Sequence, residues 1–162
     1  MADFKRIVFW LSRKFNWVAA AGVLALMALT FSDVVLRYFL GWPVRGTYEV
    51  SGLIGLVMIS FALGQTQVRR SHISVDLLPL LLPRRAQAVL SSTVYLASLC
   101  LSLLFSWRSA VYAHSLYLVG ETSQTEKIPF APFGYTIAAG FAVLCLVFLV
   151  DFLNSLSEAL KK

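Results

Sequence analysis

Asp33 and Arg37 are the first pair of residues in this chain whose types and spacing allow ion or proton chemistry. They are four residues apart, which brings two side chains together on one face of a helix, and Glu49 is close enough in sequence to join them. Such a group is either a structural ion pair or an ion-coupling site. We expect the structural pair, because Asp33 lies about 24 Å along an apolar stretch that begins near residue 17, close to its far end.

His72 and Asp76 are also four residues apart, which suggests a proton relay or a metal pair. Two ligands do not make a metal site, so a histidine at the membrane surface is the simpler interpretation. Cys100 and Cys145 fall within apolar stretches, where a thiol is inert. The sequence contains no nucleophile–base pair, phosphate-binding loop or metal-ligand quartet. We therefore expect neither an enzyme nor a cofactor.

Four apolar stretches must position these residues. Hydrophobic residues make up 59% of the 162-residue chain and charged residues 14%, which excludes a soluble domain. Stretches that cross a bilayer form helices, because backbone groups cannot stay unpaired in hydrocarbon. The sequence thus predicts an all-α integral membrane four-helix bundle, as a single domain over 1–162. The expected transmembrane helices cover about 17–36, 49–68, 86–108 and 132–152.

The distribution of Lys and Arg predicts the orientation, because cytoplasmic loops retain positive charge. Ten of the 14 basic residues lie in the two termini and in the loop between the second and third helices. We therefore expect both termini in the cytoplasm and the other two loops outside. The net charge of +6 suits anionic phospholipids and is no argument for nucleic acid. The four remaining basic residues are Arg37, Arg45, Arg108 and Lys127.

Two further segments are amphipathic or too short to cross. Residues 4–15 place apolar and basic side chains on different faces, which predicts an N-terminal interfacial helix. The segment 71–85 has prolines four apart and predicts a short interfacial segment between the second and third helices. The third helix either continues beyond Trp107 or breaks near Ser109; periodicity permits both. Small residues four apart, such as Ser60 and Gly64, predict close helix contacts.

Three short motifs lie in the three loops, in a fixed order. The first runs from Arg37-Tyr38-Phe39 through Gly41 and Pro43 to Gly46-Thr47-x-Glu49. The second is His72-Ile73-x-Val75-Asp76, and the third is Ser123-x-Thr125-x-x-Ile128-Pro129. Together they resemble the small, Q-type membrane subunit of the tripartite ATP-independent periplasmic (TRAP) transporters. The family often has a glycine before the histidine, where this chain has Ser71.

The resemblance implies an accessory subunit of a sodium-driven importer in the bacterial inner membrane. Its substrates would be organic acids such as C4-dicarboxylates, 2-oxo acids or sialic acid. Its partners would be a large TRAP membrane subunit, which carries the transport sites and moves them, and a periplasmic substrate-binding protein. The small subunit would enlarge the stationary scaffold and help to dock the binding protein. The absence of charged residues around Met27, Met58, Ser98 and Phe141 agrees with such a passive role.

The charged residues of the outer loops are the candidates for docking the binding protein; they are Arg45, Glu121, Glu126 and Lys127. They are equally interpretable as ordinary solvated loop charges. A different class of function is a small proton-coupled multidrug efflux protein, which also has four helices but needs a carboxylate deep in its first helix. A four-helix membrane enzyme using glutathione would need an arginine-rich pocket. Asp33 lies too near the end of the first helix to serve as the carboxylate of an efflux protein. Arg108 alone does not make the arginine-rich pocket that the enzyme needs.

Overall fold

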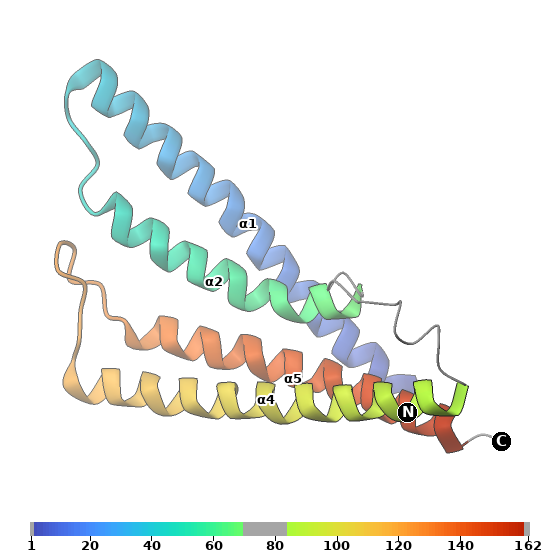
Figure 1. Ribbon diagram of the computed structural model, residues 1–162. Coiled ribbons are helices and arrows are strands. Elements are labelled where there is room, and N and C mark those ends of the chain that lie inside the picture. Colours follow the sequence, from blue (N-terminus) through green and yellow to red (C-terminus); the bar gives the residue numbers. More distant parts are fainter. Residues whose placement is uncertain (1, 70–83, 161–162) are drawn as a thin grey trace.

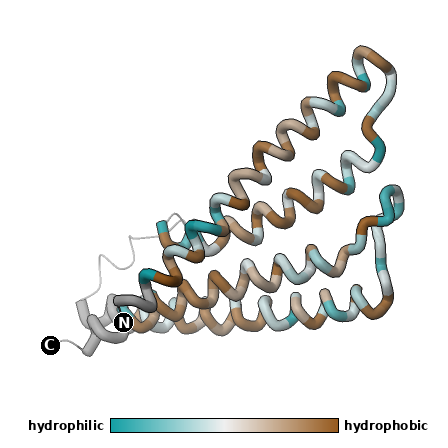
Figure 2. Tube along the Cα trace, turned by 180° about the vertical axis from the view of Figure 1, so that it is seen from behind, coloured by the Kyte–Doolittle hydropathy of each residue, from teal (hydrophilic) through white to brown (hydrophobic). Residues whose placement is uncertain are grey.

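The computed structural model describes residues 2–69 and 84–160, which form four helices. They are α1 (Ala2–Leu40), α2 (Thr47–Val68), α4 (Arg84–Val119) and α5 (Ala131–Leu160). Each is long and apolar enough to cross a membrane. Figure 2 shows that most of their length is hydrophobic, while hydrophilic residues gather at the connections and near the termini. The predicted all-α four-helix architecture is confirmed.

The helices α2 and α5 form the centre of the bundle. α2 packs against α1 and against α5, and α5 packs in turn against α4. The connections 41–46 and 120–130 lie at one end of the bundle, and the two termini lie at the other (Figure 1). We call these the loop end and the terminal end. The α1–α2 pair and the α4–α5 pair spread apart toward the loop end.

The helix α4 ends where the chain reaches a glycine in the left-handed region. Gly120 has φ of 68°, a conformation that residues with a side chain rarely adopt. Its N–H and that of Glu121 both donate to the carbonyl of Leu116, at 3.0 and 3.2 Å. These bonds satisfy a carbonyl that the last turn leaves unpaired, as is usual at helix C-termini. The chain then turns back into the connection that leads to α5.

Two boundaries differ from the sequence-based expectation. Segments 4–15 and 17–36 form one uninterrupted helix, α1, rather than two. That the first turns of α1 lie on the membrane surface stays a prediction. The third expected span, 86–108, is part of α4, which continues eleven residues further, so the alternative of a break near Ser109 is wrong. The expected interfacial segment at 71–85 lies largely outside the described residues.

A buried apolar cluster lies toward the terminal end, where α1, α2 and α5 meet. Val8, Val147 and Val150 form an almost fully buried cluster there. Polar side chains border this cluster and bond to one another between helices. The hydroxyl of Ser12 donates to Oε1 of Gln65 at 3.1 Å. Bonds of this kind favour one relative arrangement of the helices, because an unpaired polar group in this environment is costly.

At Gly140 the helix α5 comes very close to the backbone of α2. A Cβ atom at this position would lie 2.2 Å from the carbonyl oxygen of Ser60, far inside van der Waals contact. One turn further along α2, a Cβ atom at Gly64 would lie 3.0 Å from a methyl carbon of Val143. The small residues predicted from the Ser60–Gly64 spacing therefore do lie at a helix–helix contact. A side chain at position 140 would therefore collide with the backbone of α2.

We predict that Gly140→Ala destabilises the protein by about 1–3 kcal/mol, because the new methyl group must push α2 and α5 apart. Gly55→Ala is the matched control, since no atom lies within 4 Å of a Cβ at Gly55. That control should be neutral or slightly stabilising, because alanine favours helix over glycine. Thermal unfolding of the purified variants in detergent measures both effects. Equal unfolding midpoints for the two variants would contradict the crossing described above.

Candidate functional site

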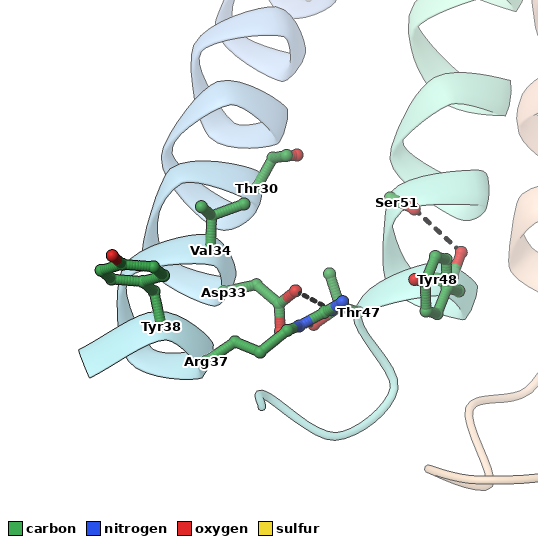
Figure 3. Close-up of a pocket in the computed structure, with 8 residues that line it drawn as sticks. All are labelled: Thr30, Asp33, Val34, Arg37, Tyr38, Thr47, Tyr48 and Ser51. Carbon is green, nitrogen blue, oxygen red and sulfur yellow. Dashed lines mark hydrogen bonds and ion pairs between the residues drawn. The ribbon is translucent and has the colours of Figure 1, made fainter. Parts of the chain in front are cut away.

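Asp33 is a buried carboxylate near the loop end of α1, and only 4% of its surface is exposed. Its Oδ1 atom accepts the backbone N–H of Val44 at 2.9 Å and lies 3.3 Å from the hydroxyl of Thr47. Its Oδ2 atom pairs with the guanidinium of Arg37. In Figure 3 the side chain of Arg37 runs alongside this carboxylate toward Thr47. Asp33 thereby ties the connection between α1 and α2 back onto α1.

The surroundings of Asp33 explain why a buried charge is tolerated at this position. Burying an unpaired carboxylate is expensive, and charge-assisted bonds to several donors offset the cost. Arg37 supplies the opposite charge, and half of its side chain remains exposed. Thr47 begins α2, and its hydroxyl also lies 2.8 Å from the carbonyl of Val44. The carboxylate therefore acts as a structural acceptor for the turn.

Glu49 does not join this pair; it reaches the other connection. It lies in the first turn of α2 and accepts a hydrogen bond from the hydroxyl of Ser123. Its Oε1 atom also accepts the backbone N–H and the hydroxyl of Thr125, at 3.1 and 2.9 Å. One carboxylate thus binds three donors of the segment between α4 and α5. Each connection of the loop end is thus held by one carboxylate, the first by Asp33 of α1 and the second by Glu49 in the first turn of α2.

The connection between α4 and α5 has a defined shape of its own. The N–H of Ser123 donates to the carbonyl of Ile128 at 2.9 Å, and that of Phe130 donates to the carbonyl of Glu121 at 3.2 Å. These bonds close a small loop that projects from the bundle. Its Glu126 side chain lies over Gly46, where an added Cβ would come within 2.5 Å of Cγ of Glu126. The two connections are therefore in contact.

A cleft of about 550 Å³ opens between α1 and α2 beside the Asp33–Arg37 pair (Figure 3). Its walls carry exposed aromatic rings and aliphatic groups, with the ion pair at one side. Among the described residues, no three His, Cys, Asp or Glu side chains come together as a metal site would require. The one carboxylate in its lining, Asp33, is already bonded to donors. The lining residues are Thr30, Asp33, Val34, Arg37, Tyr38, Thr47, Tyr48 and Ser51.

The four residues expected to dock a binding protein all lie at the loop end and are all exposed; they are Arg45, Glu121, Glu126 and Lys127. Arg45 belongs to the first connection and the other three to the second. The contact between Gly46 and Glu126 joins the two connections into one surface. The motif residues His72, Val75 and Asp76 lie outside the described residues.

The comparison with known protein families decides the assignment. The DctQ component of the tripartite ATP-independent periplasmic transporters matches residues 26–158. The chain belongs to the DctQ family. The match begins within α1 and ends within α5, so it includes both loop-end connections and both carboxylates that hold them. No match was found among curated proteins.

Membership in the DctQ family confirms the resemblance drawn from the loop motifs. The chain is a small TRAP transporter subunit, and its four apolar helices make it a multi-pass membrane protein. As a component of a tripartite transporter, it works beside other proteins. Its family is a component of a transporter.

We predict that Asp33→Ala lowers the free energy of unfolding by about 1–3 kcal/mol, because the N–H of Val44 then loses its acceptor. Arg37→Ala should cost less, since Arg37 is half exposed and Asp33 keeps its other donors. Asp33→Asn, which retains an acceptor oxygen, should fall between them. Chemical denaturation in detergent gives this order; a larger loss for Arg37→Ala than for Asp33→Ala would refute it.

We also predict that Glu49→Ala frees the connection between α4 and α5 without unfolding the helices. The amide of Thr125 should exchange its hydrogen roughly ten times faster, because it loses its acceptor. Glu121→Ala removes an exposed carboxylate of the same loop and serves as the control. Hydrogen–deuterium exchange followed by mass spectrometry resolves peptides over 121–130. Identical exchange in wild type and Glu49→Ala would show that Glu49 does not hold this segment.

Proposed function

We propose that this chain is the accessory small permease subunit of a sodium-driven, binding-protein-dependent importer of organic acids. The substrate would be a C4-dicarboxylate, a 2-oxo acid or a sialic acid. In this proposal the protein lies in the bacterial inner membrane with both termini in the cytoplasm. The excess of basic residues in the termini and in the loop between α2 and α4 supports that orientation. The loop end then faces the periplasm.

The single observation that carries the proposed role is the loop end held together by Asp33 and Glu49. A docking surface must keep its shape while a partner binds and leaves, because ordering a flexible loop reduces affinity. Both connections here are bonded to the first turn of α2. Neither carboxylate is left to carry an ion, which argues against the small multidrug efflux class. The subunit would enlarge the stationary scaffold of a large TRAP membrane subunit.

The proposed partner at this surface is the periplasmic substrate-binding protein. Arg45, Glu121, Glu126 and Lys127 are exposed and carry both signs of charge. Charges arranged in this way guide association and fix the orientation of a partner more than they add raw affinity. Anionic phospholipids would contact the basic residues of the terminal end, among which Arg6 and Lys14 are exposed.

A direct test reconstitutes the transporter in liposomes with and without this chain. Sodium-driven uptake of an organic acid that requires this chain together with the large subunit and the binding protein would support the proposal. Uptake at the same rate without this chain would contradict the accessory role. Dye efflux or thiol transfer by the chain alone would move the assignment to another class of protein.

We predict that reversing the charge of Arg45, Glu121, Glu126 and Lys127 together weakens binding of the loaded binding protein at least about tenfold. The fold should persist, because these side chains are exposed. Arg6→Glu, at the opposite end of the bundle, is the control and should leave binding unchanged. Surface plasmon resonance on the reconstituted membrane complex gives the affinities. Unchanged affinity and uptake in the fourfold variant would eliminate this docking surface.

A further inference from the structure

The relative register of α4 and α5 is fixed by three contacts. The hydroxyl of Ser106 donates to the carbonyl of Ala138 at 2.9 Å. Ala113 packs against Gly134, where an added Cβ would come within 2.7 Å of the Cβ of Ala113. The rings of Phe105 and Phe141 stack with centroids 5.4 Å apart. These contacts place residues 105–113 of α4 beside residues 134–141 of α5.

This register places Arg108 at an apolar level of the bundle. Arg108 lies between Ser106 and Ala113 in sequence, so it lies beside the second turn of α5. At 1.5 Å per residue, this level is roughly 10 Å along the axis of α5 from the start of that helix. Residues Ala131–Ser155 of α5 are the most hydrophobic of the four candidate spans. The sequence had suggested that Arg108 marks the outer end of the third helix. In the structure α4 continues eleven residues beyond Arg108, to Val119.

The side chain of Arg108 is exposed on the side of α4 that faces away from α5. Its neighbours one turn away, Leu104 and Tyr112, are 57% and 62% exposed, and the adjacent Trp107 is 70% exposed. By contrast, Ser102 and Ala113 on the opposite side are buried against α5. Within the described part of the chain, no carboxylate forms an ion pair with Arg108; the ion pair found there joins Arg37 to Asp33.

An arginine at such a level needs a partner from outside the chain. A charged side chain within a membrane is costly unless it pairs with an opposite charge or reaches the headgroups. The neighbours of Arg108 favour a protein partner, because Trp, Tyr and Arg are the residues enriched at the centres of protein interfaces. The middle of the exposed face of α1 differs: Leu24, Met27 and Phe31 are apolar there, and Trp17 and Tyr38 lie only toward its two ends, which suits lipid.

We propose that Arg108 is a recognition residue within the membrane, pairing with a carboxylate on a helix of the large membrane subunit. The partner helix packs on the face of α4 formed by Leu104, Trp107, Arg108 and Tyr112. The inference rests on the proposed function, which supplies such a subunit. α4 is the least covered of the four helices within its own chain, so this face is free to receive it. The Asp or Glu of the partner supplies the opposite charge that Arg108 lacks within the described part of its own chain.

Photo-crosslinking in native membranes tests which face carries the large subunit. A photoreactive amino acid replaces Leu104 or Tyr112 on α4, or Leu24 or Phe31 on α1, while Arg108 stays in place. We expect crosslinks to the large subunit from the α4 positions. If the large subunit co-purifies but crosslinks only to α1, or if the α4 positions capture only lipid, this inference fails and the proposed function stands. If no large subunit accompanies the wild-type chain, both fail.

Substitution of Arg108 tests the charge itself. Arg108→Ala should lower the recovered complex at least about tenfold, because a buried partner carboxylate is left unpaired. Arg108→Lys keeps the charge and should retain most of the complex. Arg6→Ala removes an exposed arginine at the terminal end and serves as the matched control. Equal recovery of complex with Arg108→Ala and Arg6→Ala would overturn the proposed ion pair.

Discussion

The loop end of this protein depends on two carboxylates. Each of them binds one of the two connections between helices. Asp33 holds the connection from α1, and Glu49 holds the connection from α4 to α5. Both carboxylates accept backbone N–H groups, which would otherwise need water or another acceptor. The apolar packing that joins α1, α2 and α5 lies at the terminal end, around Val8, Val147 and Val150. Toward the loop end the helix pairs diverge, so polar bonds there replace apolar contact.

Apolar packing at the terminal end and polar bonds at the loop end suit a stationary subunit. The first helix carries no charged residue between Trp17 and Ser32, and the carboxylate that follows is fully engaged in the turn. A transport pathway needs polar groups that become free to bind and release an ion or substrate. Here the polar groups at both ends connect helices to one another, as Gln67 and Asp151 do at the terminal end. These bonds join the helices to one another, and α1 and α4 carry most of the large hydrophobic side chains that the described chain leaves exposed.

The sequence predicted the number of helices and the Asp33–Arg37 contact, because both follow from local patterns. Apolar length sets a span, and a spacing of four sets a pair on one helix face. The partners of Glu49 were out of reach, since Ser123 and Thr125 are more than 70 residues away in sequence. The length of α4 was less well predicted, although the absence of Gly and Pro between Arg84 and Val119 was a signal for continuity. The depth of Arg108 depends on the register between two helices, which hydropathy does not encode.

The central claim is that this chain is a subunit and does not work alone. The most direct test is to tag it at native expression level, extract it gently from its host membrane and identify by mass spectrometry what accompanies it. We expect a large polytopic TRAP membrane subunit in near-stoichiometric amount. A chain recovered alone or as a self-dimer, from membranes that contain the large subunit, would contradict the account.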